Sequence, residues 1–137
     1  MSANIIDGNK IANDIRNEVS EKVTTIKNSQ NNIPGLAVVL IGNNPASMSY
    51  VRGKERDCEM VGIKTRTFKI GQNTSEQEVL DLIKKLNIDN NYHGILTQLP
   101  FPKHIDERLI IDAINPYKDV DGIGTNSAGL LSIDKPV

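Results

Sequence analysis

The chain has 137 residues and carries 16 basic and 17 acidic side chains, a formal net charge of −1. This length predicts one domain, residues 1–137, and the charge balance argues against nucleic acid or an anionic membrane as partner. The sequence has no apolar run near the ~20 residues of a membrane span, no secretory signal pattern, and one cysteine, Cys58, which excludes an internal disulfide. We therefore expect a cytoplasmic protein.

The first predicted helix follows Asp7, whose side chain can cap it. Its apolar stripe recurs at spacings of four and three, at Ile11, Ile15, Val19, Val23 and Ile26. Asn31-Asn32 and Pro34-Gly35 end this helix. Residues 36–41, LAVVLI, then form an apolar run without alternation, which is typical of a strand covered on both faces.

The turn at residues 42–45 precedes a second helix, which Ser47 or Ser49 can open. That helix is expected to run to about Val61, because Gly62 fits a C-terminal cap.

A second strand is predicted at residues 63–70, where Thr and Phe supply strand propensity. Ser75 and Glu78 form a capping-box pattern for a third helix with an apolar stripe at Val79, Leu82, Ile83 and Leu86. Residues 94–97 predict a third strand that ends at Gln98.

The remaining segments are less regular. Pro100 and Pro102 force an extended stretch, and a short helix is expected near residues 106–114. Residues 119–123 fit either a fourth strand or a loop, and residues 130–137 give no clear prediction. The alternation of helices and strands predicts an α/β fold, an open three-layer αβα domain with a mostly parallel sheet.

Open α/β sheets bind ligands beyond the carboxyl ends of their strands. Tyr50 and Lys54 follow the first strand on one helix face, Gln98 closes the third, and Asp121 lies in the turn at residues 119–122. If the strands are parallel, these side chains can face one cleft.

Pattern alone also fits plainer roles for these residues. Lysines are mostly exposed, which favours a solvated Lys54, and Asp121-Gly122 is a common turn pair. His93 and His104 have no third ligand in view and predict surface histidines, with no metal site. No G-x-G-x-x-G run follows a strand.

Three strings carry a more specific signal: PGLAVVLIGNNPASMSYVRGKERDCEMVGI (34–63), GILTQLPFPKHI (94–105) and PYKDVDGIGTNSAGLL (116–131). Together, and in this order, they closely resemble the methylenetetrahydrofolate dehydrogenase/cyclohydrolase family. The resemblance extends over nearly the whole chain. The Tyr-x-x-x-Lys helix and the Lys-Asp-Val-Asp-Gly turn are its most distinctive parts.

The resemblance implies an activity and a set of site residues. The family oxidises 5,10-methylenetetrahydrofolate by hydride transfer, usually to NADP, and hydrolyses the methenyl product to 10-formyltetrahydrofolate. It implies tetrahydrofolate derivatives as ligands, no metal, and a homodimeric parent enzyme. By this resemblance, the family's catalytic lysine falls on Lys54, its stacking tyrosine on Tyr50 and its lysine-partner glutamine on Gln98. Two further substrate-binding residues fall on Leu99 and Pro100, and the pterin-binding aspartate falls on Asp121.

Chemistry makes these implied roles reasonable. A carboxylate at Asp121 can accept both N–H donors of the pterin amide edge, and Tyr50 can stack on the aminobenzoyl ring. The methenyl intermediate is a cation, so repulsion and desolvation favour a neutral Lys54 that can transfer protons as water attacks. Gln98 can orient that amine without adding negative charge.

The resemblance has two departures. Many family members read Phe-His-Pro where this chain reads Ile123-Gly124-Thr125. The family also continues into a Rossmann-type NADP domain and a returning C-terminal helix. We therefore expect the folate-binding half alone, an amino-acid-dehydrogenase-like N-terminal domain with its partner Rossmann domain absent. Dehydrogenase activity would need that half, and the first helix would expose an apolar stripe that invites self-association.

Three other interpretations stay open at this point. The chain can be a folate-binding fragment without useful catalysis, because an open cleft orients substrate poorly. It can be the N-terminal domain of an amino-acid or shikimate-type dehydrogenase, although Lys-Asp-Val-Asp-Gly and Tyr-x-x-x-Lys argue against this. It can also be a structural or dimerisation domain, which would bind no folate.

Overall fold

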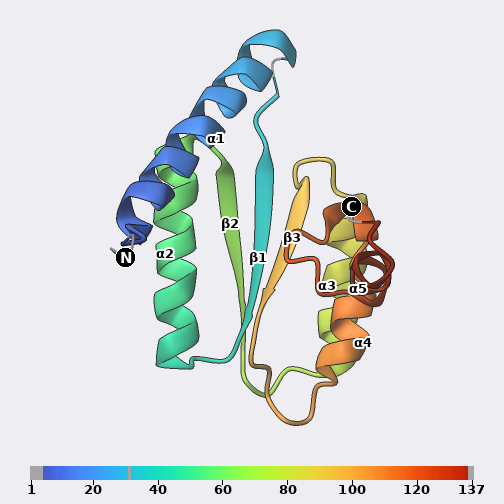
Figure 1. Ribbon diagram of the computed structural model, residues 1–137. Helices are drawn as coiled ribbons and strands as arrows, with labels where there is room; N and C mark the ends of the chain where they lie inside the picture. The colour runs from blue at the N-terminus through green and yellow to red at the C-terminus, as the bar shows by residue number, and fades with distance from the viewer. Residues whose placement is uncertain (1–4, 31, 136–137) are drawn as a thin grey trace.

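Three parallel strands form the sheet of this protein in a computed structural model, which describes residues 5–30 and 32–135 (Figure 1). The central strand β1 (Gly35–Ile41) pairs with β2 (Lys64–Ile70) on one edge and with β3 (Gly94–Gln98) on the other. The connections run through α2 (Pro45–Val61) and α3 (Glu76–Ile88). All three carboxyl ends therefore lie at one edge of the sheet, as predicted.

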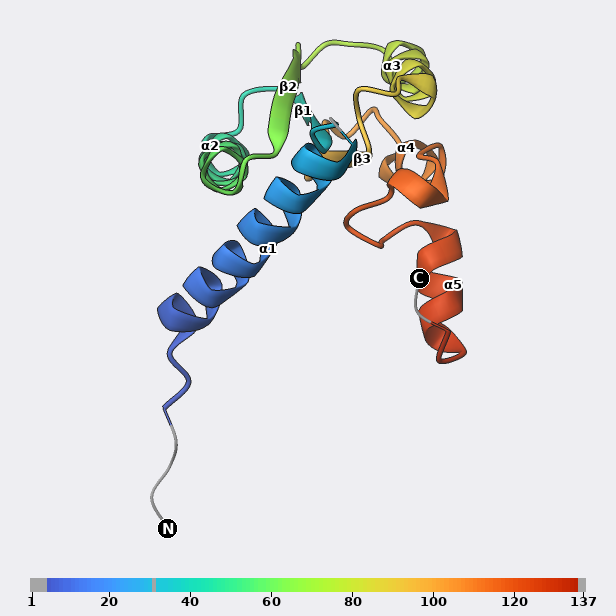
Figure 2. The same ribbon diagram turned by 90° about the horizontal axis from the view of Figure 1, so that it is seen from above.

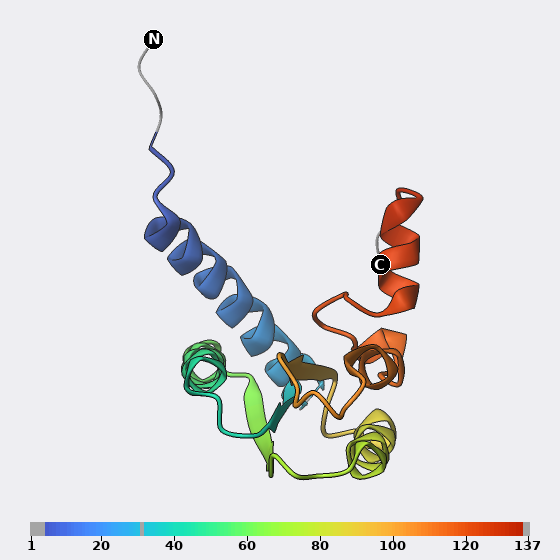
Figure 3. The ribbon, with the colours of Figure 1, turned by 90° about the horizontal axis from the view of Figure 1, so that it is seen from below.

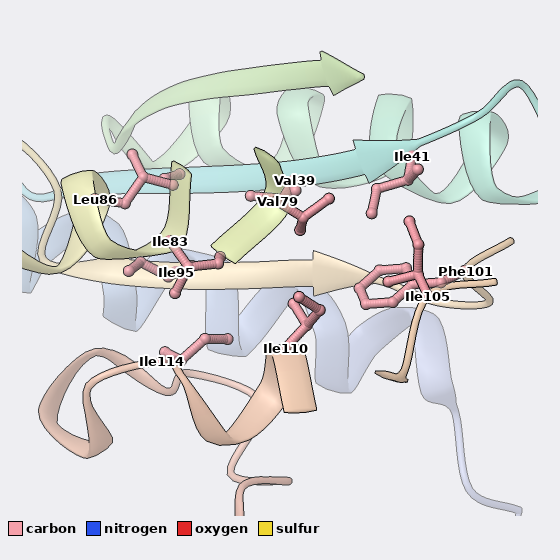
Figure 4. Packing of buried hydrophobic residues seen from close by; sticks show 11 residues of the cluster. Val39, Ile41, Val79, Ile83, Leu86, Ile95, Phe101, Ile105, Ile110 and Ile114 are labelled. Carbon is pink, nitrogen blue, oxygen red and sulfur yellow. The ribbon is translucent and has the colours of Figure 1, made fainter. Parts of the chain in front are cut away.

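Successive residues of β1 face opposite sides, and both sides are buried. One face packs on α3 and α4 (Glu107–Asp112) through a cluster of aliphatic side chains that includes Val39, Ile83, Ile95 and Ile110 (Figure 4). The other face places Val38 and Leu40 with Val51 of α2 and Leu96 of β3. Helices α1 (Gly8–Gln30) and α2 contact each other on this second side. The three-layer αβα architecture is thus confirmed.

The start of α2 differs from the prediction. The helix begins at Pro45, because the Asn44 Oδ1 atom accepts hydrogen bonds from Ala46 N at 2.9 Å and Ser47 N at 3.2 Å. Proline suits the first helical position, since it has no N–H to satisfy there. The predicted openings at Ser47 and Ser49 were wrong. The C-terminal cap at Gly62 is confirmed, with a left-handed φ of 83°.

Other predicted boundaries hold closely. The Asp7 side chain accepts from Lys10 N at the start of α1, and Ser75 and Glu78 form the full capping box of α3. Each strand begins within one residue of its predicted start. The short helix α4 follows its cap Asp106 and ends two residues before the expected Ile114. Asn31 lies outside the described residues.

The last segment resolves the open choice at residues 119–123. They form a loop after the 3-10 turn η1 (Pro116–Lys118), with one isolated parallel bridge from Asp119 to Ile95. A helix that was not predicted, α5 (Thr125–Ser132), follows this loop. Of the tail that gave no prediction, Pro136 and Val137 lie outside the described residues.

Helix α1, beside α2, and helix α5, after α4, both project away from the rest of the domain in the same general direction (Figures 2 and 3). The stripe of α1 is buried only towards its C-terminal end, at Val23, whereas Ile11 and Ile15 are 48% and 55% exposed. The expected exposure of this stripe is therefore confirmed for its N-terminal half. Within the described ranges, no helix combines the length and apolar character needed to cross a membrane.

Candidate functional site

Lys54 lies on the stripe of α2 that faces the sheet. The stripe repeats at spacings of four and three, and its other members, Ser47, Val51, Cys58 and Val61, are all buried. Lys54 continues this spacing and is half-buried itself. Helix geometry therefore directs its ammonium group inward along the sheet, not into bulk water.

Gln98 meets Lys54 because of the two-residue period of β3. Leu96 packs on the α2 face, and Gln98, two residues later, faces the same side. The Lys54 Nζ atom donates to Gln98 Oε1 at 3.0 Å. Sequence order alone placed these residues near one sheet edge, and the structure brings them into direct contact.

The orientation of the Gln98 amide is fixed by its second hydrogen bond. Gln98 Nε2 donates to the Leu99 carbonyl oxygen at 3.0 Å, and the buried Ser47 hydroxyl donates to the same oxygen at 3.3 Å. A carbonyl oxygen can only accept, so the amide nitrogen must face Leu99 and the amide oxygen must face Lys54. The chain thus holds a neutral acceptor against the lysine amine.

Asp121 stands on the loop beside this pair. Among the described residues, no hydrogen bond of the protein reaches its carboxylate, so its oxygens remain available to a ligand. Burial raises the pKa of the Asp121 carboxyl; the nearby Lys54 opposes this shift, and the negative charge of Asp119 adds to it. The influence of Lys54 indicates that the two side chains share one electrostatic neighbourhood. Gly122, with φ of 65°, turns the backbone directly after Asp121.

The residues before Asp121 anchor the loop. Lys118 Nζ donates to the carbonyl oxygens of Leu86 and Asp89 at the end of α3, at 2.9 Å each. Val120 packs beside Gly94 at the start of β3, where a Cβ on the glycine would lie 2.4 Å from Val120 Cγ1. Neither role was predicted, because the partners lie 26 to 32 residues away along the chain and no local pattern signals them.

The other predicted site residues lie nearby along the chain. Tyr50 is one helical turn before Lys54 and is 67% exposed. Leu99 is half-buried and Pro100 is exposed, and the peptide between them is cis. A cavity of about 500 Å³ opens at the Asp121 loop, lined by Tyr117, Val120, Asp121, Leu131 and their neighbours. Tyr50, Lys54 and Gln98 do not line it, so the structure does not show a single cleft shared by all four residues.

Comparison with known proteins decides the family. A family model described as "Tetrahydrofolate dehydrogenase/cyclohydrolase, catalytic domain" matches residues 6–121. The chain belongs to this family. Bifunctional protein FolD of Agathobacter rectalis is 51% identical over 135 residues, which are 98% of this chain and 48% of that protein. The chain spans about half the length of the curated relatives it matches.

Solved structures agree with this family assignment. The crystal structure of the bifunctional enzyme FolD from Campylobacter jejuni has a TM-score of 0.90 and 42% identity, over 93% of this chain and 45% of that one. The Trypanosoma brucei dehydrogenase-cyclohydrolase, complexed with NADP and an inhibitor, has a TM-score of 0.92 and 29% identity, over 100% of this chain and 47% of that one.

The turn after β1 does not fit the dinucleotide that this family uses. A Rossmann-type site holds the diphosphate on amides left open at the helix N-terminus that follows the first strand. In α2 the amides of Ala46 and Ser47 already donate to Asn44, and Pro45 has no N–H. We therefore assign no residue of this turn to hydride acceptance. Within residues 5–30 and 32–135, no three His, Cys, Asp or Glu side chains gather as metal ligands would.

Proposed function

We propose that residues 1–137 are the folate-binding catalytic domain of a methylenetetrahydrofolate dehydrogenase/methenyltetrahydrofolate cyclohydrolase. The observation that carries the proposal is the 3.0 Å contact between Lys54 Nζ and Gln98 Oε1, close to an Asp121 carboxylate that no hydrogen bond of the described chain occupies. Family membership supports it, as do the dehydrogenase/cyclohydrolase names of the relatives.

Folate binding follows from the acceptors and flat surfaces at the site. The pterin amide edge offers two adjacent N–H donors, and the two oxygens of Asp121 can accept both in a charge-assisted pair. The exposed ring of Tyr50 can stack on the aminobenzoyl group, because flat aromatic faces pack well together. Leu99 and Pro100, directly after Gln98, supply apolar surface near the reacting carbon.

Cyclohydrolase chemistry needs one group that moves protons near the methenyl carbon. Water attacks this carbon, and a C–O bond forms as the water loses a proton. As the bond from the carbon to N5 then breaks, the new hydroxyl loses its proton to become the formyl C=O and N5 takes a proton, so the products are 10-formyltetrahydrofolate and one released proton. A neutral Lys54 amine can accept the first proton and deliver one to N5, while Gln98 holds the amine in place.

The dehydrogenase step belongs to the whole enzyme. When bound, NADP would supply the hydride acceptor. This domain would then present the methylene carbon by holding the pterin at Asp121. The family resemblance supports the further expectations of NADP as the usual acceptor, a cytoplasmic location and a homodimeric parent.

The test is hydrolysis of 5,10-methenyltetrahydrofolate by the purified chain, followed above the buffer rate. Lys54→Met should abolish the excess rate, whereas Lys84→Met, a change at an exposed lysine on α3, should leave it unchanged. An excess rate that survives Lys54→Met would contradict the proposed role of Lys54. Folate binding without any excess rate would instead favour a binding domain that lacks useful catalysis alone.

A further inference from the structure

The Asp119 carboxylate is the centre of the loop that carries Asp121. Its Oδ1 atom accepts from Gly122 N at 3.0 Å, and its Oδ2 atom accepts from Gly124 N at 3.0 Å and from Ser127 Oγ at 3.1 Å. Hydrogen bonds to an ionised acceptor are among the stronger ones in proteins. One side chain therefore holds the backbone directly after Asp121 and the first turn of α5.

Asp119 also ties this loop to the sheet. Its backbone forms a parallel bridge with Ile95 of β3, the strand that ends at Gln98. The space around the carboxylate is tight, because a Cβ on Gly124 would lie 3.0 Å from Asp119 Oδ2. Asp121 thus lies between two restrained residues: Asp119, whose backbone is bridged to β3, and Gly122, whose N–H donates to the Asp119 carboxylate.

We propose that Asp119 is a positioning residue for Asp121, and that it sets how well Asp121 receives the amide edge of a bound pterin. The inference rests on the proposed folate function, but its structural part does not need a ligand. Both oxygens of Asp119 already accept hydrogen bonds from the loop and from α5. Of the two carboxylates, Asp121 is therefore the one available to a ligand. Its negative charge also contributes to the raised pKa of Asp121.

A matched control separates positioning from simple stability. Asp112, on α4, accepts from Thr125 N and Thr125 Oγ1, both at 2.9 Å, and so also anchors α5. Asp112 makes no hydrogen bond to residues 119–122 within the described chain. Asp112→Asn should therefore weaken α5 to a similar degree without disturbing Asp121.

The first experiment follows the Asp121 carboxyl by ¹³C NMR during a pH titration of the protein without ligand. Asp119→Asn removes a neighbouring negative charge and loosens the loop, and both changes should lower the titration midpoint of Asp121. Asp112→Asn should leave the midpoint where it is. An unchanged midpoint in Asp119→Asn would overturn the proposal, whether or not the protein binds folate.

The second experiment measures the affinity for 5-formyltetrahydrofolate, a stable compound with the same pterin amide edge, by calorimetry. Asp119→Asn should bind roughly tenfold more weakly, the effect of losing one or two charge-assisted hydrogen bonds, and Asp112→Asn should bind like the unaltered chain. Ser127→Ala, which removes one of the three donors, should fold even where Asp119→Asn does not and bind about two- to threefold more weakly.

The outcomes separate the two proposals. Equal affinity losses in Asp112→Asn and Asp119→Asn would reduce Asp119 to a structural residue. Full affinity in Asp119→Asn or Ser127→Ala would also overturn its role. If the unaltered chain binds no 5-formyltetrahydrofolate, the folate function fails, and an unchanged titration midpoint in Asp119→Asn would separately overturn the influence of Asp119 on Asp121.

Discussion

The packing of Gly94 against Val120 makes a sharp prediction about the loop that carries Asp121. In Gly94→Ala, the new methyl carbon would lie 2.4 Å from Val120 Cγ1 and 3.4 Å from Leu36 Cδ1. Carbon atoms in van der Waals contact lie ~3.5–4.0 Å apart, so the loop must move away from β3 by about 1 Å. Overpacking of this kind costs about 1–3 kcal/mol of stability.

The same geometry predicts that a second substitution rescues the first. Val120→Ala removes the clashing Cγ1 atom, and alone it should cost little, because Val120 is 54% exposed. The double variant should then regain most of the lost stability, a coupling of about 1–2 kcal/mol between the two sites. Urea unfolding of the four proteins at equal concentration measures this coupling. A double variant as unstable as Gly94→Ala would refute the packing described here.

Three further predictions concern the core, the loop anchor and pH. Ile83→Ala should lower the unfolding free energy by about 2–5 kcal/mol in urea, since Ile83 is fully buried between α3 and the sheet; a loss below 1 kcal/mol would contradict this packing. Lys118→Met should cost about 1.5–3 kcal/mol, because the carbonyls of Leu86 and Asp89 lose a charged donor, and Lys118→Arg should recover part of this loss in thermal melts. Asp121→Asn should raise Tm at neutral pH and not at acid pH; a Tm that fell at neutral pH would be inconsistent with a partly desolvated, unfavourable charge.

The raised pKa of Asp121 means that its ionised form is less favourable in the folded protein than in the unfolded chain. The folded protein holds the Asp121 proton at pH values where the unfolded chain, with an ordinary aspartate pKa near ~4, has released it. Stability from this group is therefore complete below the unfolded pKa and falls as pH rises towards the folded one. An asparagine cannot ionise, so its variant escapes that loss. A charge kept at a cost to stability is common at functional sites.

The regular elements were predictable because their signals are local. The Ser75-Glu78 capping box, the apolar run of β1 and the glycine after α2 each lie within a few residues of the structure that they specify. The start of α2 was missed because Ser47 competes with Asn44 as a cap. The Pro45 that follows Asn44 was the signal that decides between them.

Helix α5 could not be predicted because its support is distant. Its sequence, TNSAGLLS, contains a glycine and lacks a strong apolar stripe. Its first turn is instead held by Asp112 and Asp119, which lie 13 and 8 residues before their partners in the helix. Such contacts appear only once the chain has folded.

The site was predictable only in part. The spacing of Ser47, Val51, Cys58 and Val61 already included Lys54, so its place on the buried stripe was present in the pattern. The pattern alone still favoured a solvated lysine, because lysine side chains are mostly exposed whatever stripe of a helix they lie on. The family resemblance paired Lys54 with Gln98, and in the structure the two-residue period of β3 brings these two side chains into contact. Lys118 and Asp119 were recognised only as parts of a family string, without their roles.

Mapping of folate binding tests the central claim most directly. Tetrahydrofolate should be titrated into the ¹⁵N-labelled chain under reducing conditions, and the shifted signals assigned. The account predicts that the largest shifts fall at Tyr50, Lys54, Gln98, Asp121 and Gly122, and that Asp121→Asn removes them. Shifts at Tyr117 and Leu131 without shifts at Lys54 and Gln98, or no shifts at millimolar ligand, would contradict a folate site built by Lys54, Gln98 and Asp121.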